Sequence, residues 1–414
     1  MDDAARAVEA VARRSYARLI SFLAARSRDV SAAEDALSEA VVAALQSWPE
    51  LGIPSKPEAW LLHAARRRLI DAIRRNQTRD ANQEALRDML AEAEDLSTAH
   101  AFPDQRLELL FVCAHPAIDD RMHTPLMLQV VLGLDAAAIA AAFVTSATTM
   151  GQRLARAKAK IKATHIAFEV PGGDQLGPRL LSVLEAIYAA YGHGWDDVDG
   201  GDTQRRGSSA EAIWLARMLV ELLPDEPEAL GLLALMQYCE ARRPARRARD
   251  GAYVPLNDQD TRLWDRPRLE EADRALARAA VRERPGRFQL EAAIQSAHAE
   301  RARGRAVDWP AIALLYEGLV RLAPTLGAFV GRAAAVAEAE GPARALELLD
   351  ALPASAVATY QPYWAARAHF ERALGHSLEA RAAFDTALGL TDDPSVQRFL
   401  EQRATTADSR GGLR

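Results

Sequence analysis

The apolar residues of this chain recur at the spacing of an α-helix. The clearest series has intervals of four, three and four residues: Met150, Leu154, Ala157 and Ile161. An α-helix has 3.6 residues per turn, so this spacing places the four side chains on one narrow stripe. Such a stripe has to be buried against another element. The pattern therefore predicts helices packed on helices rather than a β-sheet.

The composition favours the same fold class. Hydrophobic residues make up 49% of the chain but aromatic ones only 6%, and Ala, Leu, Arg and Glu are abundant. Unbranched side chains lose little rotamer freedom in a helix, whereas β-branched ones lose more. At about 150 residues per domain, the 414 residues suggest two to four domains. We expect an all-α protein.

Several classes of protein and site are disfavoured. The chain has no apolar run of 18 residues and no signal peptide, so we expect a cytoplasmic protein with no membrane partner. Cys113 and Cys239 are its two cysteines and are expected to be buried thiols. Cys113, His115 and His123 lack a fourth metal ligand, so we expect no metal and no cofactor.

Charge is distributed in blocks although the formal net charge is only -6. Residues 61–79 hold six arginines and one aspartate, whereas residues 80–105 hold seven acids and one arginine. Residues 145–165 hold five cations and no acid. Charge blocks are often only solvated faces, so the helical geometry has to decide what they do.

The first basic block predicts an amphipathic helix that begins near Lys56. Leu62, Ala65 and Leu69 fall on one stripe. The other side carries cations and a histidine: His63, Arg67, Arg68, Arg74 and Arg75. Few acids are spaced to pair with them, which favours an anionic partner. A preceding helix, ended by Pro49, is expected to expose an acidic face: Glu34, Asp35 and Glu39.

The second basic block has the pattern of a helix-turn-helix motif. A short helix with Ile139 and Phe143 is followed by a turn, and Ser146 is a plausible N-cap for the next helix. One face of that second helix combines small polar residues with cations: Thr148, Thr149, Gln152, Arg153, Arg156 and Lys160. This is the arrangement that a helix reading base edges and holding phosphates requires.

Together these segments resemble sigma factors of the extracytoplasmic-function group, within the sigma-70 family. AEDALSEAVVAAL and the segment from WPELGIPSKPEAW to IDAIRR look like region 2, and DQRLELLFVCAHPAI with residues 133–162 looks like region 4. The resemblance implies region 2 at 1–79, an acidic linker at 80–103 and region 4 at 104–168.

The resemblance also implies roles for the residues of both blocks. The first helix would meet the -10 promoter element through Trp60, His63, Arg67, Arg68, Arg74 and Arg75. An aromatic ring there can stack on an unpaired base. The acidic face would dock on the β′ clamp helices of core RNA polymerase, and region 4 would meet the β flap. The helix after Ser146 would read the -35 element.

The remaining residues predict a helical extension. Residues 176–285 are expected to form a helical domain, residues 286–402 TPR-like repeats, and residues 403–414 a disordered tail. Gly341 and Gly375 are 34 residues apart, close to the TPR period. The repeats would either bind a protein or peptide or serve only as structure. The glycine- and aspartate-rich segment 191–207 is expected to be a surface loop.

The predicted function is that of a sigma factor that joins core polymerase and directs it to promoter DNA, with the extension modulating its activity. In related chains such an extension takes the place of a separate anti-sigma protein. It would work in the bacterial cytoplasm and on the nucleoid. The alternative is a helix-turn-helix regulator with a TPR-like sensor, outside polymerase. No enzymatic motif is found, and we expect no enzyme.

Overall fold

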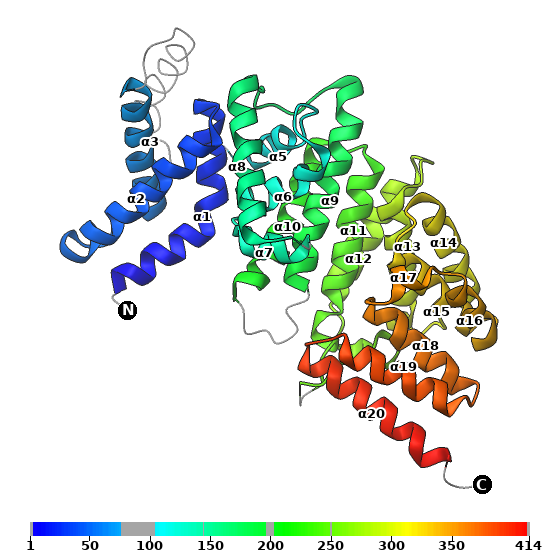
Figure 1. The fold of residues 1–414 in the computed structure, drawn as a ribbon. Helices are drawn as coiled ribbons and strands as arrows, with labels where there is room; N and C mark the ends of the chain where they lie inside the picture. Colours follow the sequence, from blue (N-terminus) through cyan, green and yellow to red (C-terminus); the bar gives the residue numbers. More distant parts are fainter. Residues whose placement is uncertain (1–2, 76–103, 144, 196–202, 249–250, 412–414) are drawn as a thin grey trace. The chain divides into compact units, whose positions relative to one another are not determined.

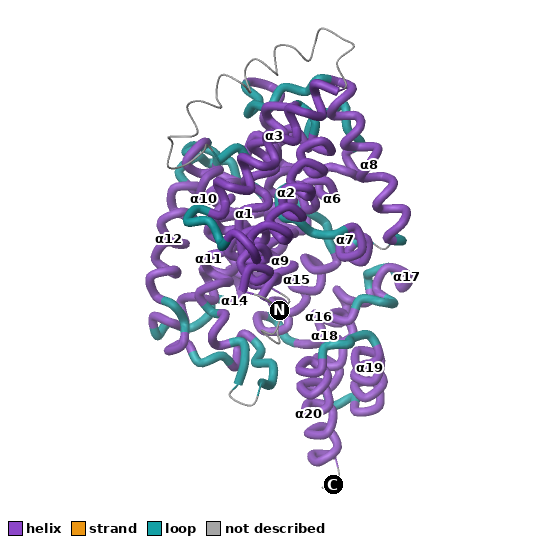
Figure 2. The backbone as a smooth tube through the Cα atoms, turned by 90° about the vertical axis from the view of Figure 1, so that its left-hand side faces the viewer, coloured by secondary structure: helices purple, strands orange, loops and turns teal. Residues whose placement is uncertain are grey.

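The computed structural model describes residues 3–75, 104–143, 145–195, 203–248 and 251–411. The predicted acidic linker at 80–103 lies outside the described residues. Figure 2 shows helices joined by loops, and the described residues contain no strand, only one isolated bridge between Arg247 and Tyr253. The predicted all-α fold is confirmed. No helix among the described residues is long and apolar enough to cross a lipid bilayer.

The chain forms two compact units. The first contains residues 1–195 and 204–215, and the second contains residues 196–203 and 216–414. The first unit therefore holds both predicted sigma segments together with the first residues of the extension. Its helices are α1 (Asp3–Ser27), α2 (Val30–Leu51), α3 (Pro57–Arg75), α5 (Arg106–Cys113), α6 (Asp120–Val130), α7 (Ala136–Ala142), α8 (Ala147–Thr164), α9 (Leu176–Trp195) and part of α10 (Thr203–Leu222) (Figure 1).

Within the first unit, α1, α2 and α3 pack against one another around Leu19, Leu37 and Leu69, all of them buried. Asp29 begins α2 as its N-cap, because its carboxylate accepts a hydrogen bond from the Ala32 N–H at 3.0 Å. Helix α2 continues past Pro49 to Leu51, so the prediction that Pro49 ends it was wrong. A proline in the last turn removes one hydrogen-bond donor, and the following residues can still complete the helix.

The other helices of the first unit form a second group. Helix α9 packs on α6 and α5 through a buried apolar face: Leu180, Val183, Leu184 and Ile187. His123 Nδ1 on α6 lies 3.1 Å from Ser182 Oγ on α9, at hydrogen-bond distance. Pro125 lies inside α6. The first helix of the predicted extension thus belongs to the core of the predicted region 4.

The described residues of segment 191–207 are helical, contrary to the surface loop expected for the segment. Tyr191 to Trp195 complete α9, and α10 begins at Thr203. Tyr191 is only 2% exposed. Burial of this ring keeps the chain helical through Gly192, where glycine alone would cost about 1 kcal/mol. Residues 196–202 lie outside the described part of the chain.

The second unit is a series of helices packed on their neighbours. After the end of α10, its helices are α11 (Pro227–Ala241), α12 (Arg266–Ala280), α13 (Arg287–Ala299), α14 (Trp309–Leu322), α15 (Leu326–Ala339), α16 (Pro342–Asp350), α17 (Ala354–Val357), α18 (Gln361–Ala373), α19 (Ser377–Gly389) and α20 (Pro394–Gly411). Residues 403–411, expected in a tail, lie in α20, where Ala404 is buried in a cluster with Leu400.

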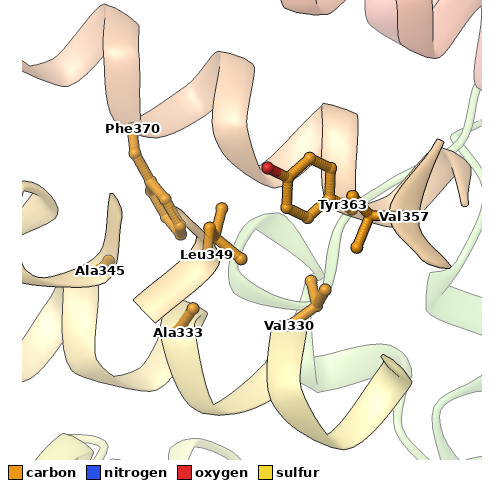
Figure 3. Packing of buried hydrophobic residues seen from close by; sticks show 7 residues of the cluster. All are labelled: Val330, Ala333, Ala345, Leu349, Val357, Tyr363 and Phe370. Atoms are coloured by element: carbon orange, nitrogen blue, oxygen red, sulfur yellow. The ribbon is translucent and has the colours of Figure 1, made fainter. Parts of the chain in front are cut away.

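The later helices of this unit recur at a nearly constant interval. Helices α14, α16 and α19 begin at residues 309, 342 and 377. Helices α15, α18 and α20 begin at 326, 361 and 394. Figure 3 shows how neighbouring helices share one core, in which side chains of α15, α16, α17 and α18 interdigitate: Val330, Ala333, Ala345, Leu349, Val357, Tyr363 and Phe370. Each helix pair buries its apolar face on the next pair, as in repeat proteins.

Candidate nucleic-acid interface

Helix α3 presents the first predicted group of cations. Leu62, Ala65 and Leu69 are buried, as their spacing predicts, whereas His63, Arg67 and Arg74 are exposed. Arg66 is also buried, with 5% of its surface exposed. Not every arginine of this block therefore faces solvent. Arg75 ends the helix, and its side chain is outside the described residues.

Two arginines of α3 have acidic partners, although the sequence suggested that few acids could pair with them. Arg68 Nη1 lies 2.7 Å from Glu39 Oε2 on α2, and Arg74 Nη1 lies 3.9 Å from Asp71 Oδ1. Both pairs are solvent-exposed, so each contributes little to stability. Arg67 forms no ion pair with any described residue. This helix can still offer cations to phosphates at little structural cost.

Trp60, the aromatic candidate for base stacking, is half-buried on α3. Its ring meets that of Trp48 on α2 edge to face, with the centroids 5.5 Å apart and the planes at 74°. Trp48 itself is 2% exposed. This contact fixes the orientation of Trp60 while part of its ring stays accessible. A ring held in this way can stack on a base with little loss of conformational entropy.

Helix α8 has the geometry that its sequence predicts. Ser146 is its N-cap: the Ser146 Oγ accepts a hydrogen bond from the Thr149 N–H at 3.1 Å. The hydroxyl of Ser146 also donates to Thr149 Oγ1 at 2.8 Å. The four residues of the stripe described above are all buried: Met150, Leu154, Ala157 and Ile161. The preceding helix α7 is capped by Asp135, so one short and one longer helix flank the turn, as in a helix-turn-helix motif.

The side chains predicted to meet DNA project from α8 on the side away from its buried stripe. We call this set the DNA face: Thr148, Thr149, Gln152, Arg153, Arg156 and Lys160. All are exposed except Thr149, which is half-buried. Within the described part of the chain, Arg153, Arg156 and Lys160 form no ion pair. Their positive charge is therefore not neutralised by the protein itself.

A groove of about 680 Å³ runs beside the DNA face and adds residues that the sequence analysis missed. Its lining includes Arg153, Arg156 and Lys160 from α8, together with Arg121 and Phe143. Arg121 is exposed in the first turn of α6. It lies outside the basic block from which α8 was identified, so only the fold brings it to this groove. The fourth cation extends the positive surface beyond α8.

The acidic residues of α2 lie in different environments. Asp35 and Glu39 are exposed, and Glu39 pairs with Arg68. Glu34 was expected to face solvent, but only 17% of its side chain is exposed. Its carboxylate accepts a hydrogen bond from Lys158 Nζ of α8 at 2.6 Å. The acidic face, which we define as Glu34, Asp35 and Glu39, is therefore partly covered.

The two cysteines differ from each other. Cys113 is fully buried, as predicted, whereas Cys239 is half-buried. Burial raises the pKa of Cys113 well above that of a free thiol, and the nearby Glu34 carboxylate adds to this effect. A thiol kept protonated is a poor nucleophile and metal ligand.

Comparison with known proteins identifies two segments of the chain. Residues 11–79 match sigma-70 region 2, and residues 179–280 match a family of unknown function (DUF6596). An uncharacterised protein of Rhizobium meliloti (strain 1021), R00370, is 38% identical over 382 residues, which cover 91% of this chain and 90% of that protein. No solved structure matches the chain.

Proposed function

Because the chain belongs to one family with the Rhizobium meliloti protein R00370 and carries a sigma-70 region 2 domain, we propose that it is a sigma factor of the extracytoplasmic-function type. It would bind core RNA polymerase and direct it to start transcription at particular promoters. Sigma-70 proteins act in transcription and catalyse no reaction of their own. This protein is accordingly a transcription factor and not an enzyme.

The observation that carries the proposal is the position of α3 in the matched domain. Residues 11–79 include α2, α3 and most of α1. The exposed His63, Arg67 and Arg74 and the oriented ring of Trp60 all lie in this segment. Cations neutralise phosphates, and an aromatic ring can hold an unpaired base. We assign these residues, with Arg68 and Arg75, to the -10 element.

The -35 element is assigned to the DNA face of α8. Gln152 and Arg153 are exposed in the second turn of the helix, Arg156 is exposed near its middle, and Lys160 follows one turn later. Gln and Arg have the bidentate geometry that matches adenine and guanine edges, while Lys suits a phosphate. Glu34, Asp35 and Glu39 are assigned to the β′ clamp helices, and region 4 to the β flap.

The extension is proposed to modulate this activity. The regular interval of the helices from α14 to α20 supports a TPR-like array. Such arrays present extended surfaces on which a protein or peptide can bind. Acting with polymerase, the protein would lie in the bacterial cytoplasm and on the nucleoid.

The alternative is a helix-turn-helix regulator that is not a polymerase subunit. In such a protein the region 2 segment would have no function. The decisive experiment mixes the full chain with core polymerase and measures complex formation and the transcripts made from a promoter library. We expect a stable complex and transcripts that start downstream of a common pair of sequence elements. Binding to DNA without binding to core polymerase would support the alternative instead.

The test of modulation by the extension requires a truncated chain that keeps α9. A chain that stops near Gly172 would lose α9, whose Val183 and Leu184 are buried in the first unit. A stop after Leu222 keeps α9 and α10 whole. If the array inhibits, the shorter chain should make more transcript per molecule bound to core polymerase. Equal transcription by both chains, with unchanged helicity of the shared part, would argue against modulation.

A further inference from the structure

Arg179, a buried arginine near the start of α9, forms no ion pair with any described residue. Only 6% of its surface is exposed. Its Nη2 donates a hydrogen bond to the neutral Gln175 Oε1 at 2.9 Å, and its Nε has no partner in the described part of the chain. Burial lowers the pKa of Arg179, and Glu169 offsets this effect only in part. A buried cation without a counter-ion costs free energy, so an anion that reached it would be stabilised.

The guanidinium of Arg179 is directed at the beginning of α9. Side chains of a helix lean toward its N-terminus, and the bond to Gln175 shows that Arg179 does so, because Gln175 ends the short turn Gly173–Gln175 that leads into α9. Gly172 occupies the N-cap position, and no described side chain caps this end. The first N–H groups of a helix have no partner within it and carry partial positive charge. Arg179 and these N–H groups therefore face the same place.

The backbone at this end of α9 is open to a ligand. A Cβ atom on Gly172 or Gly173 would meet nothing within 4 Å. Two acids lie close by, Asp174 in the turn itself and Glu169 before it. Both are exposed, and neither forms an ion pair with Arg179 within the described residues. The positive charge of this site is therefore not neutralised by the chain.

His115 supplies a further donor from the turn between α5 and α6, the two helices on which α9 packs. The Ala117 N–H donates a hydrogen bond to His115 Nδ1 at 3.1 Å, so the neutral ring carries its proton on Nε2. Nε2 has no hydrogen-bond partner among the residues that the structure describes. Burial lowers the pKa of His115, and Arg179 lowers it further. The imidazole and the guanidinium thus lie close enough to act on one anion.

We propose that a small phosphate-bearing anion binds at the start of α9, held by Arg179, by the first N–H groups of the helix and by His115 Nε2. A guanidinium matches phosphate oxygens with parallel donors, and a helix N-terminus favours negative charge. The burial of Arg179 favours a small anion over a DNA strand, whose phosphates meet exposed cations such as those of the DNA face. The ligand is inorganic phosphate or a phosphate monoester. It joins the extension to the turn before α6, and the site does not depend on the function proposed above.

Isothermal titration calorimetry of the full chain with inorganic phosphate, at an ionic strength held constant with chloride, tests the site. We expect one phosphate per chain. Arg179→Gln should raise the Kd at least tenfold, because it removes the charge-assisted hydrogen bonds. Arg381→Gln, which changes an exposed arginine of the second unit, is the matched control and should leave the Kd unchanged. The proposal fails if the wild type shows no saturable binding, or if both variants weaken it equally.

A second variant keeps the test decisive if Arg179→Gln does not fold. His115→Asn retains an acceptor for the Ala117 N–H but removes Nε2. We expect a protein with the helicity of the wild type in circular dichroism and a phosphate Kd about threefold higher, as the loss of one hydrogen bond predicts. An unchanged Kd in the folded variant would contradict the site as described.

The source of the phosphate group is found by changing the titrant. If adenosine monophosphate binds at least as tightly as inorganic phosphate, and Arg179→Gln weakens both, the site takes a phosphorylated metabolite. If adenosine monophosphate does not compete with inorganic phosphate, the site takes the free ion. If Arg179→Gln instead leaves phosphate binding unchanged and lowers the affinity of holoenzyme for promoter DNA, the arginine serves the DNA backbone and the proposal is wrong.

Discussion

The two compact units differ in how some of their arginines are used. In the second unit, arginines join separate helices through ion pairs: Arg217–Glu271, Arg332–Glu317, Arg367–Asp350 and Arg403–Asp258. In the first unit, Arg67, Arg153 and Arg156 are exposed and form no ion pair with a described residue. A count of arginines would therefore not distinguish a structural surface from a binding surface.

This difference indicates where an anionic partner can bind. A paired guanidinium has already exchanged water for a carboxylate, and a phosphate would have to displace that carboxylate. An unpaired one offers its charge and its donors without this competition. The first unit is therefore the one expected to hold nucleic acid. The following predictions test that contrast, starting with the largest effect.

Reversal of charge on the DNA face should have the largest effect. Arg153→Glu with Arg156→Glu removes two contacts worth about 1 to 3 kcal/mol each and adds repulsion. We expect promoter affinity to fall by at least a hundredfold in a gel-shift titration with holoenzyme, and the free energy of unfolding to change by less than about 0.5 kcal/mol. The same reversal at Arg344 and Arg381, two exposed arginines of the second unit, should leave DNA binding intact. Equal losses of promoter affinity in both variants would contradict the proposed difference between the arginines of the two units.

Acid should weaken the second unit through a buried histidine. Burial, with help from Arg242 and Arg301, lowers the pKa of His298 to about 4 from 6.5. The unfolded chain then binds a proton between these values while the folded chain does not. Stability is full above about pH 6.5 and falls as the pH drops toward 4, by at most about 3 kcal/mol.

Urea unfolding of the full chain at several pH values, followed for the wild type and His298→Gln, measures this effect. The His298 side chain packs edge to face on Trp309, with the ring centroids 5.3 Å apart. The variant should lose most of the pH dependence between 4 and 6.5 even if it is less stable overall. If the free energy of unfolding changed with pH equally in both proteins, His298 would not be the cause of the pH dependence.

Removal of a structural arginine should destabilise the second unit. Arg367 Nη1 lies 2.6 Å from Asp350 Oδ1, and Arg367 Nη2 lies 3.4 Å from Glu371 Oε1. Glu371 is 5% exposed. We expect Arg367→Met to lower the free energy of unfolding by about 2 kcal/mol, because a buried carboxylate loses a charged partner. Arg381→Met, which breaks an exposed pair with Asp385, should cost at most about 0.5 kcal/mol. Comparable costs at the two sites would contradict the structural role.

The smallest effect is expected at the Arg68–Glu39 ion pair, in which an arginine assigned to DNA also has an acidic partner. Arg68 is assigned to DNA yet pairs with Glu39, and the side chains are 37% and 60% exposed. A double-mutant cycle with Arg68→Met and Glu39→Gln should give a coupling energy below about 1 kcal/mol in chemical unfolding. A coupling above about 2 kcal/mol would class Arg68 with the structural arginines and remove it from the -10 candidates.

Local rules were enough to predict the site helices. Periodicity identified the buried stripe of α8, and the capping preference of serine identified Ser146 as its start. Both depend on residues that are close together along the chain, so the sequence contains them directly. The same holds for the exposed side of α3. A local signal misled at Pro49, where α2 continues to Leu51, and at Gly192, which lies inside α9.

Contacts between distant segments could not be predicted. Glu34 and Lys158 are separated by 124 residues, and nothing near either residue indicates the other. Arg121 reaches the groove beside α8 only because α6 is folded against that helix. The helical wheel of α8 does place Lys158 and Lys162 apart from the DNA face. This asymmetry is the one sequence signal that could have suggested a second partner for α8.

The packing of α9 on α6 has a consequence for how such a chain can evolve. Leu180 and Ile187 are buried residues of α9, the first helix of the extension, and α9 packs on α5 and α6 of the segment before it. A premature stop codon after α8 would uncover that surface and favour aggregation. Once gained, the extension is therefore hard to lose. A descendant could lose the later repeats, but loss of α9 would require simultaneous polar replacements on α6.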